Sequence, residues 1–150
     1  MHTTAAKTQV EDRLDRTMLD LLQAVNELLA ALVRASGSPR RHARERDAKP
    51  QVRDVGWLRP LAMVSVELEH AIRRRSALRA VTVAARCDEL TRLLATSPTT
   101  GSDFAVRYAW ERAQSPSLAI LHSRVMVGCA QVTSRCSPSC MVDFDEGSAE

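Results

Sequence analysis

Aromatic residues are scarce in this chain of 150 residues, which has two tryptophans, two phenylalanines and one tyrosine. A globular enzyme of this size that folds on its own usually has more bulky rings in its core. Glycine and proline are also few, with five and six residues, and few stretches are rich in the β-branched and aromatic residues that favour strands. Alanine and leucine supply the hydrophobic fraction instead, and both favour helices. The composition therefore predicts an all-α fold without a sheet.

Motifs of catalysis and of phosphate binding are absent from the sequence. The glycines are scattered singly, and neither a Gly-x-Ser-x-Gly nor a His-Glu-x-x-His motif occurs. His70 follows Glu69 and is interpreted as a surface residue, and the acidic pair Asp88-Glu89 is interpreted as part of a solvated face. We therefore expect a protein that is not an enzyme, with no catalytic residue, no cofactor and no small-molecule substrate.

Signals for secretion and for membrane insertion are missing as well. The segment 1–9 is polar and has no apolar stretch of the kind found in signal peptides. No apolar run approaches the roughly 18 residues that a membrane span needs. We expect a soluble intracellular protein without membrane contact, in which the cysteines are reduced thiols. They are Cys87, Cys129, Cys136 and Cys140.

Three of these cysteines are of the residue type that binds zinc. Cys136 and Cys140 have a spacing found in zinc sites, and His122 and Cys129 would complete a set of four ligands. His122 and Cys129, however, lie in an apolar helix-like run and lack the close spacing of a second ligand pair. We therefore expect no metal site, and we interpret Cys87 as a small buried residue.

Against these absences, apolar residues recur at alternating steps of four and three residues near the N-terminus. These steps match the a and d positions of a heptad seam, along which another helix packs. Leu22 and Leu29 widen the apolar face. A helix that is so apolar on one side must bury that side, and we expect it to form a partner interface. The seam positions are Leu14, Met18, Leu21, Val25, Leu28 and Leu32.

Segments rich in proline, glycine and serine divide the chain into four expected helices. The first covers 10–35, and the second covers 60–96, with a kink or a division at Arg73-Arg74-Arg75 because three arginines span nearly a full turn. Two shorter helices are expected over 104–113 and 117–132. The expected domains are a flexible tail over 1–9, a long helical hairpin over 10–96 with a basic loop at about 36–56, short C-terminal helices over 97–133 and an acidic tail over 134–150.

Charge is distributed unevenly, although the net charge of +3 makes the chain only mildly basic. Arginines concentrate in the loop between the first two helices, whereas acidic residues concentrate near residue 150. The simplest interpretation of the basic loop is a solvated segment, but it could also contact nucleic acid or an acidic partner. The residues for such a contact are Arg40, Arg41, Arg44 and Arg46.

Two segments carry a resemblance to a known family. In segment 10–29, VEDRLDRTMLDLLQAVNELL, a basic-leucine pair at Arg13-Leu14 precedes Glu27-Leu28-Leu29. In segment 78–93, LRAVTVAARCDELTRL, Leu78-Arg79-Ala80 is followed by Asp88, Leu90 and the pair Arg92-Leu93. Both segments are similar to helices of the subunit 22 family of the Mediator complex, also called the surfeit locus protein 5 family. The loop between them is longer and more basic than the family pattern, and the C-terminal part does not match it.

The resemblance implies a scaffolding role in the nucleus, in a transcription coactivator. Members of the family pair with a small partner, subunit 11, in an antiparallel four-helix bundle to which each chain contributes two helices. The pair docks on a subunit 17 scaffold in the head module and acts on the RNA polymerase II machinery. On the second helix we expect the interface positions Leu78, Val81, Ala85, Leu90 and Leu94.

Three other interpretations stay open at this point. The chain could be a subunit of another helical assembly, such as a tethering, kinetochore or organelle-biogenesis complex. It could be a small helical module that binds nucleic acid through its basic loop. It could also form a monomeric bundle by itself, if the later helices fold back over the first two.

Overall fold

The computed structural model describes residues 3–37, 54–95, 97, 99 and 101–136. Over these residues the backbone forms five α-helices and one short 3-10 helix and contains no strand, so the predicted all-α fold is confirmed. The elements are α1 (Thr3–Ser36), η2 (Gly56–Leu58), α2 (Arg59–Arg73), α3 (Arg79–Ala95), α4 (Asp103–Gln114) and α5 (Pro116–Cys136). None of these helices combines the length and the apolar character that a membrane span requires.

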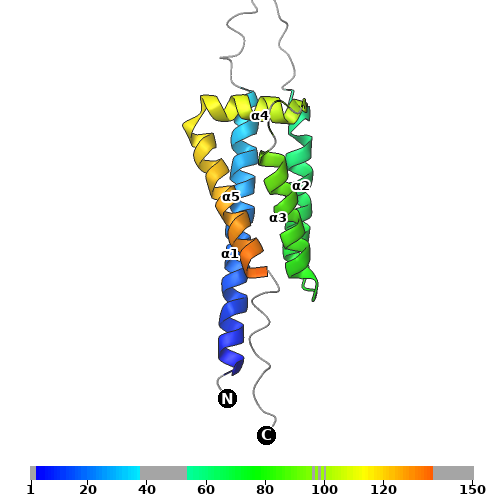
Figure 1. Ribbon diagram of the computed structural model, residues 1–150, viewed down its shortest axis with the longest axis vertical. Helices are drawn as coiled ribbons and strands as arrows, with labels where there is room; N and C mark the ends of the chain where they lie inside the picture. The colour runs from blue at the N-terminus through cyan, green and yellow to red at the C-terminus, as the bar shows by residue number, and fades with distance from the viewer. Residues whose placement is uncertain (1–2, 38–53, 96, 98, 100, 137–150) are drawn as a thin grey trace, which may run out of the picture.

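Four of the helices form an up-down-up-down bundle (Figure 1). Helix α1 packs against α2 and α5, and α3 packs against the same two helices, so α1 and α3 occupy opposite corners. Helix α4 lies across one end of the bundle and connects α3 to α5 (Figure 1). A single chain therefore supplies all four helices, and the long hairpin predicted over 10–96 is three helices instead.

Helix α1 is longer than predicted. It begins at Thr3 rather than at Val10, because alanine and lysine favour helix and neither glycine nor proline occurs before residue 37. Its 34 residues extend over about 51 Å, whereas the 21 residues of α5 cover about 31 Å. Arg135, near the end of α5, donates a hydrogen bond to the carbonyl of Arg13. The first turns of α1 therefore project beyond α5 (Figure 1).

The predicted second helix is divided in two at the run of three arginines. Helix α2 ends at Arg73, Arg74 adopts an extended conformation, and α3 begins at Arg79. In a continuous helix these arginines would cover about 200° of the circumference, and one of them would turn toward the core. The break leaves all three arginines exposed to solvent. It also allows α3 to run back along α2.

The core is a continuous set of aliphatic side chains along the axis of the bundle. Buried residues recur on each helix at steps of three and four, as expected for helices that pack on one face. From α1 these are Met18, Leu21, Ala24, Val25, Leu28 and Leu32; from α2 Leu61, Val64, Leu68, Ala71 and Ile72; from α3 Val83, Cys87, Leu90 and Leu94; and from α5 Leu118, Val125, Cys129 and Val132.

Local capping explains how α4 and α5 start. The hydroxyl of Ser102 accepts a hydrogen bond from the backbone N–H of Ala105 at 3.0 Å, which caps α4. Gly101 precedes this cap with a φ of 76°, a conformation that glycine adopts more readily than other residues. Ser115 separates α4 from α5, and its hydroxyl accepts from the N–H of Leu118 at 3.4 Å. The bounds of α4 each lie one residue from the predicted ones, and those of α5 lie one and four residues from them.

Candidate functional site: a groove between α1 and α5

The seam predicted on the first helix is buried inside the chain itself. Five of its positions, from Met18 to Leu32, are exposed by 2% or less, and Leu14 is half-buried at the margin of the core. Helices α2, α3 and α5 enclose this seam. The periodicity located the buried face of α1, but the apolar surface that covers it comes from the same chain. That these positions form a partner interface stays a prediction.

The interface positions predicted on the second helix do not share one face. Leu90 and Leu94 are buried in the core, whereas Leu78 and Val81 are exposed by 68% and 65%. Ala85 is exposed as well. Because α3 starts at Arg79, its core face is set by Val83, Cys87, Leu90 and Leu94, and residues near Val81 lie on the opposite side at about 100° per residue.

Two further predictions concern the arginines of the basic loop and the two segments that resemble the Mediator family. Arg40, Arg41, Arg44 and Arg46 lie outside the described residues. The two segments that resemble the Mediator family, 10–29 and 78–93, fall on α1 and α3. These helices lie at opposite corners of the bundle, with α2 and α5 between them. They do not form the antiparallel hairpin that the resemblance implies.

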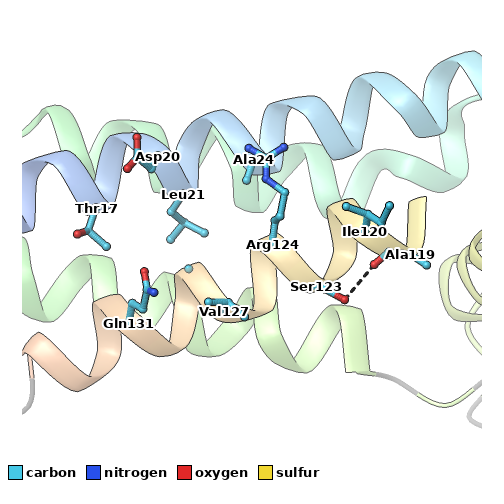
Figure 2. A pocket seen from close by; sticks show the side chains of 11 residues that line it. Thr17, Asp20, Leu21, Ala24, Ala119, Ile120, Ser123, Arg124, Val127 and Gln131 are labelled. Atoms are coloured by element: carbon cyan, nitrogen blue, oxygen red, sulfur yellow. Dashed lines mark hydrogen bonds between the residues drawn. The ribbon is translucent and has the colours of Figure 1, made fainter. Parts of the chain in front are cut away.

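An open groove of about 570 Å³ runs between α1 and α5 (Figure 2). Its lining is mainly apolar, with polar side chains along the rim. The residues from α1 are Thr17, Asp20, Leu21 and Ala24, and those from α5 are Ala119, Ile120, Ser123, Arg124, Val127, Gly128 and Gln131. Of the groove residues, only Leu21 belongs to the predicted seam, and no site residue was predicted on α5.

At the floor of the groove, Gly128 of α5 lies against Leu21 of α1. A Cβ atom at position 128 would lie 3.0 Å from the Cδ1 atom of Leu21, so glycine allows the two helices to pack tightly there. Beside this contact, Ile120 and Val127 are exposed by 63% and 55%. They are seven residues apart and so lie on the same side of α5, two turns from each other. The groove thus has an apolar wall that no described residue covers.

Polar contacts between the two helices flank the groove. Arg124 of α5 donates to the carboxylate of Glu27 of α1 at 2.6 Å, and Gln23 donates to the same carboxylate at 2.8 Å. The hydrogen bonds from Gln23 and Arg124 lower the pKa of Glu27. At the other end, Arg135 donates to the hydroxyl of Thr17. Figure 2 shows Arg124 reaching from α5 across to α1 beside Ala24.

The chain was compared with protein-family models, with curated proteins and with solved structures. None of the three comparisons found a match.

The sequence analysis missed a partly buried polar cluster that joins α4 to α5. The Nε2 atom of His122 lies 3.1 Å from Nη1 of Arg112, and its Nδ1 atom lies 2.7 Å from the hydroxyl of Tyr108. Because arginine only donates, Nε2 must accept and the proton resides on Nδ1, which donates to the Tyr108 oxygen. Burial and the charge of Arg112 lower the pKa of His122. His122 is therefore a neutral residue held on both ring nitrogens.

The cysteines face one another across α3 and α5. The hydrogen bond with Cys129, followed by burial, raises the pKa of the Cys87 thiol. Cys136 is half-buried, and burial raises its pKa too. His122 and Cys129 belong to separate clusters and do not form the ligand set that was weighed for zinc. In the part of the chain that the structure describes, no three metal-ligating side chains come together; Cys140 lies outside that part.

Proposed function

We propose that this protein is a non-catalytic scaffolding subunit that binds an amphipathic helix of a partner protein in the α1–α5 groove. The observation that carries the proposal is the exposure of Ile120 and Val127 beside the groove floor, on a bundle whose core is already filled. Clustered apolar residues that stay in water typically mark a binding surface. The partner therefore attaches to a completed bundle and does not complete it.

The dimensions of the groove favour a helix as its occupant. Ile120 and Val127 are about 10.5 Å apart along α5, which equals two helical turns. A partner helix with apolar residues at i, i+3 or i+4, and i+7 presents side chains over the same length. Asp20 lies at the rim and is exposed, whereas the charge of Arg124 is compensated by Glu27 of α1. The carboxylate of Asp20 would favour a partner helix that places a basic residue beside it.

The absence of a catalytic role is part of the proposal. His122 has both ring nitrogens engaged, and Tyr108 is buried against it. The thiol of Cys87 is buried against Cys129, and its raised pKa disfavours the nucleophilic thiolate. We therefore interpret these side chains as contributing to the packing of the bundle and not to the conversion of a substrate.

Among the possible assemblies, the resemblance favours a nuclear transcription coactivator of the Mediator-head type, with a small subunit 11-like partner, a subunit 17-like scaffold and the RNA polymerase II machinery. Another helical assembly, such as a tethering, kinetochore or organelle-biogenesis complex, is the alternative. A nucleic-acid-binding module would rest on the arginines at 40, 41, 44 and 46, which the structure does not describe.

The test is affinity purification of the tagged full chain from its own cells, followed by mass spectrometry. The groove variant carries Ile120→Asp and Val127→Asp. The matched control carries Met63→Asp and Val66→Asp, which place the same charges at two exposed positions on α2. All four positions are exposed, so circular dichroism is expected to show unchanged helix content in both variants.

We expect the wild type and the α2 variant to retain the same partners and the groove variant to lose them. Equal recovery by all three proteins would contradict the groove assignment. A small helical partner together with RNA polymerase II would support the coactivator, and a different stable complex would support the alternative. A photo-crosslinking amino acid at position 127 should then join the chain directly to the partner that the groove variant loses.

A further inference from the structure

The end of the bundle where α2 turns back into α3 is strongly basic. Arg73 pairs with Glu69 at 2.7 Å, and Arg79 pairs with Asp15 of α1 at 2.9 Å. Arg74 and Arg75 are exposed, and neither has an ion pair with any residue in the described ranges. Two arginines with uncompensated charge therefore stand side by side at the tip of the turn.

An apolar stripe begins directly beside these arginines. Leu78, Val81 and Ala85 are spaced as i, i+3 and i+7. Val81 and Ala85 line one side of α3, and Leu78 lies one residue before the helix begins. All three are exposed, and Leu78 and Val81 are more exposed than any other large apolar residues among those described. They lie on the side of α3 that points away from the core residues Val83 and Cys87. This end thus combines positive charge with an uncovered apolar stripe.

The chain itself contains a segment of complementary chemistry. Residues 137–150, SPSCMVDFDEGSAE, have four acidic and no basic residues, and Met141, Val142 and Phe144 alternate with or adjoin the acids. This segment follows α5 directly, and α5 ends at the basic end because it runs antiparallel to α3 (Figure 1). The acidic residues of the segment are complementary in charge to Arg74 and Arg75, and its apolar residues could pack on the apolar stripe.

The distances along the chain allow the two to meet. Asp143 lies seven positions after Cys136, and an extended chain of that length spans at most about 25 Å. The stripe from Leu78 to Ala85 occupies about 10 Å along its axis. Helices α3 and α5 pack against each other, and the axes of packed helices lie about 8–10 Å apart, so a reach of that length is compatible with contact to the stripe and the arginines.

We propose that segment 137–150 docks on the basic end of its own bundle. The carboxylates of Asp143, Asp145 and Glu146 pair with Arg74 and Arg75, and the apolar residues between them cover Leu78 and Val81. Ion pairs at an exposed site are weak individually and are screened by salt. The contact is consequently reversible. It does not depend on the groove between α1 and α5.

The test is paramagnetic relaxation enhancement on the full chain. A nitroxide is attached to Cys140 in a Cys136→Ser background, because Cys87 and Cys129 are buried. We expect a selective loss of amide signal at residues 74–85 and not at α4. Raising salt from about 0.1 M to about 1 M shortens the Debye length from about 10 Å to about 3 Å and should restore much of that signal.

Charge reversal separates docking from mere proximity. Arg74→Glu with Arg75→Glu should abolish the signal loss, and adding Asp143→Lys with Asp145→Lys should bring it back. The matched control is Arg34→Glu with Arg59→Glu, which makes the same change in net charge at exposed positions near the other end. This control should leave the signal loss unchanged.

Three results would overturn the proposal. The first is no selective loss at residues 74–85, and the second is a loss that survives the reversal at Arg74 and Arg75. The third comes from mixing spin-labelled protein with an isotope-labelled copy that lacks the nitroxide. Signal loss in that second copy would assign the contact to two molecules and not to one.

Discussion

The two ends of the bundle differ, because helix α4 covers one of them and no described helix covers the other. At the α4 end, Trp57, Phe104 and Tyr108 are buried, with ring centroids 5.9 Å and 5.3 Å apart along the series. At the other end, no described helix crosses the bundle, and the exposed Leu78 lies in the turn that also carries Arg74 and Arg75. A chain with only five aromatic residues thus places three of them at one end. The comparison indicates that the α4 end stabilises the fold while the basic end is available for contacts.

The largest expected loss of stability comes from the buried seam of α1, which runs between the two ends. Leu28→Asp buries a carboxylate at a fully enclosed position and should lower the free energy of unfolding by at least about 4 kcal/mol. Urea denaturation of the isolated protein measures this, with Leu78→Asp as the matched control at an exposed leucine. If the isolated Leu28 variant unfolded at the urea concentration of the wild type, the seam would not be filled within one chain.

At the α4 end, Phe104→Ala should cost about 3–5 kcal/mol, because it removes a buried ring that contacts both Trp57 and Tyr108. Trp110→Ala on the same helix removes a ring that is half-exposed and should cost less than about 1 kcal/mol. Thermal and urea unfolding of both variants give the comparison. Equal losses would mean that α4 is not held through its buried face.

The polar part of the same end is expected to contribute less. Tyr108→Phe keeps the ring stack and removes the acceptor for the Nδ1 proton of His122. The free energy of unfolding should fall by about 1–2 kcal/mol, since a buried donor loses its partner. His122→Asn in the Tyr108→Phe background tests the coupling, and a purely additive result would argue against a direct bond between the two residues.

The pH dependence follows from the lowered pKa of His122. The folded protein binds this proton less readily than the unfolded chain, whose histidine titrates near about 6.5. The stabilisation is complete above that pH and is lost as pH falls through the lower folded pKa. Urea midpoints of the wild type should therefore fall from pH 7.5 to pH 5.5 by more than those of His122→Asn. Parallel decreases would show that another group titrates.

The smallest effect is expected at the basic end. Arg74→Ala with Arg75→Ala should change the free energy of unfolding by no more than about 0.5 kcal/mol, because both side chains are exposed and make no described ion pair. Urea denaturation at low salt measures the change. A decrease in the free energy of unfolding as large as that caused by Tyr108→Phe would contradict this difference, because the basic end would then contribute as much to stability as the polar contacts at the α4 end.

Particular residues show how far the sequence could predict the fold. The spacing from Met18 to Leu32 identified the buried face of α1, because helical periodicity is a local property. The arginine run at 73–75 indicated a disturbance but not a complete reversal of direction. The positions predicted on the second helix lie on different faces of α3, since Leu90 and Leu94 are buried while Leu78 and Val81 are exposed; that they form a partner interface stays a prediction.

The candidate site was less accessible to sequence reasoning. Ile120 and Val127 line a groove only because α1 lies beside α5, although 79 residues (37–115) separate the two helices in the chain. Gly128 gave no signal by itself, although it sets how closely the two helices approach. His122 was considered as a metal ligand, whereas Tyr108 and Arg112 come within its reach only through the packing of α4 on α5.

By itself, the sequence determined that this protein is helical, roughly where most helices begin and end, and which side of α1 is buried. Propensity, capping and apolar spacing act over a few residues, so they can be read without a fold. Only the tertiary structure decided that α2, α3 and α5 of the same chain cover that side. An apolar stripe specifies that it must be buried and not which helix buries it, because hydrophobic burial is non-directional.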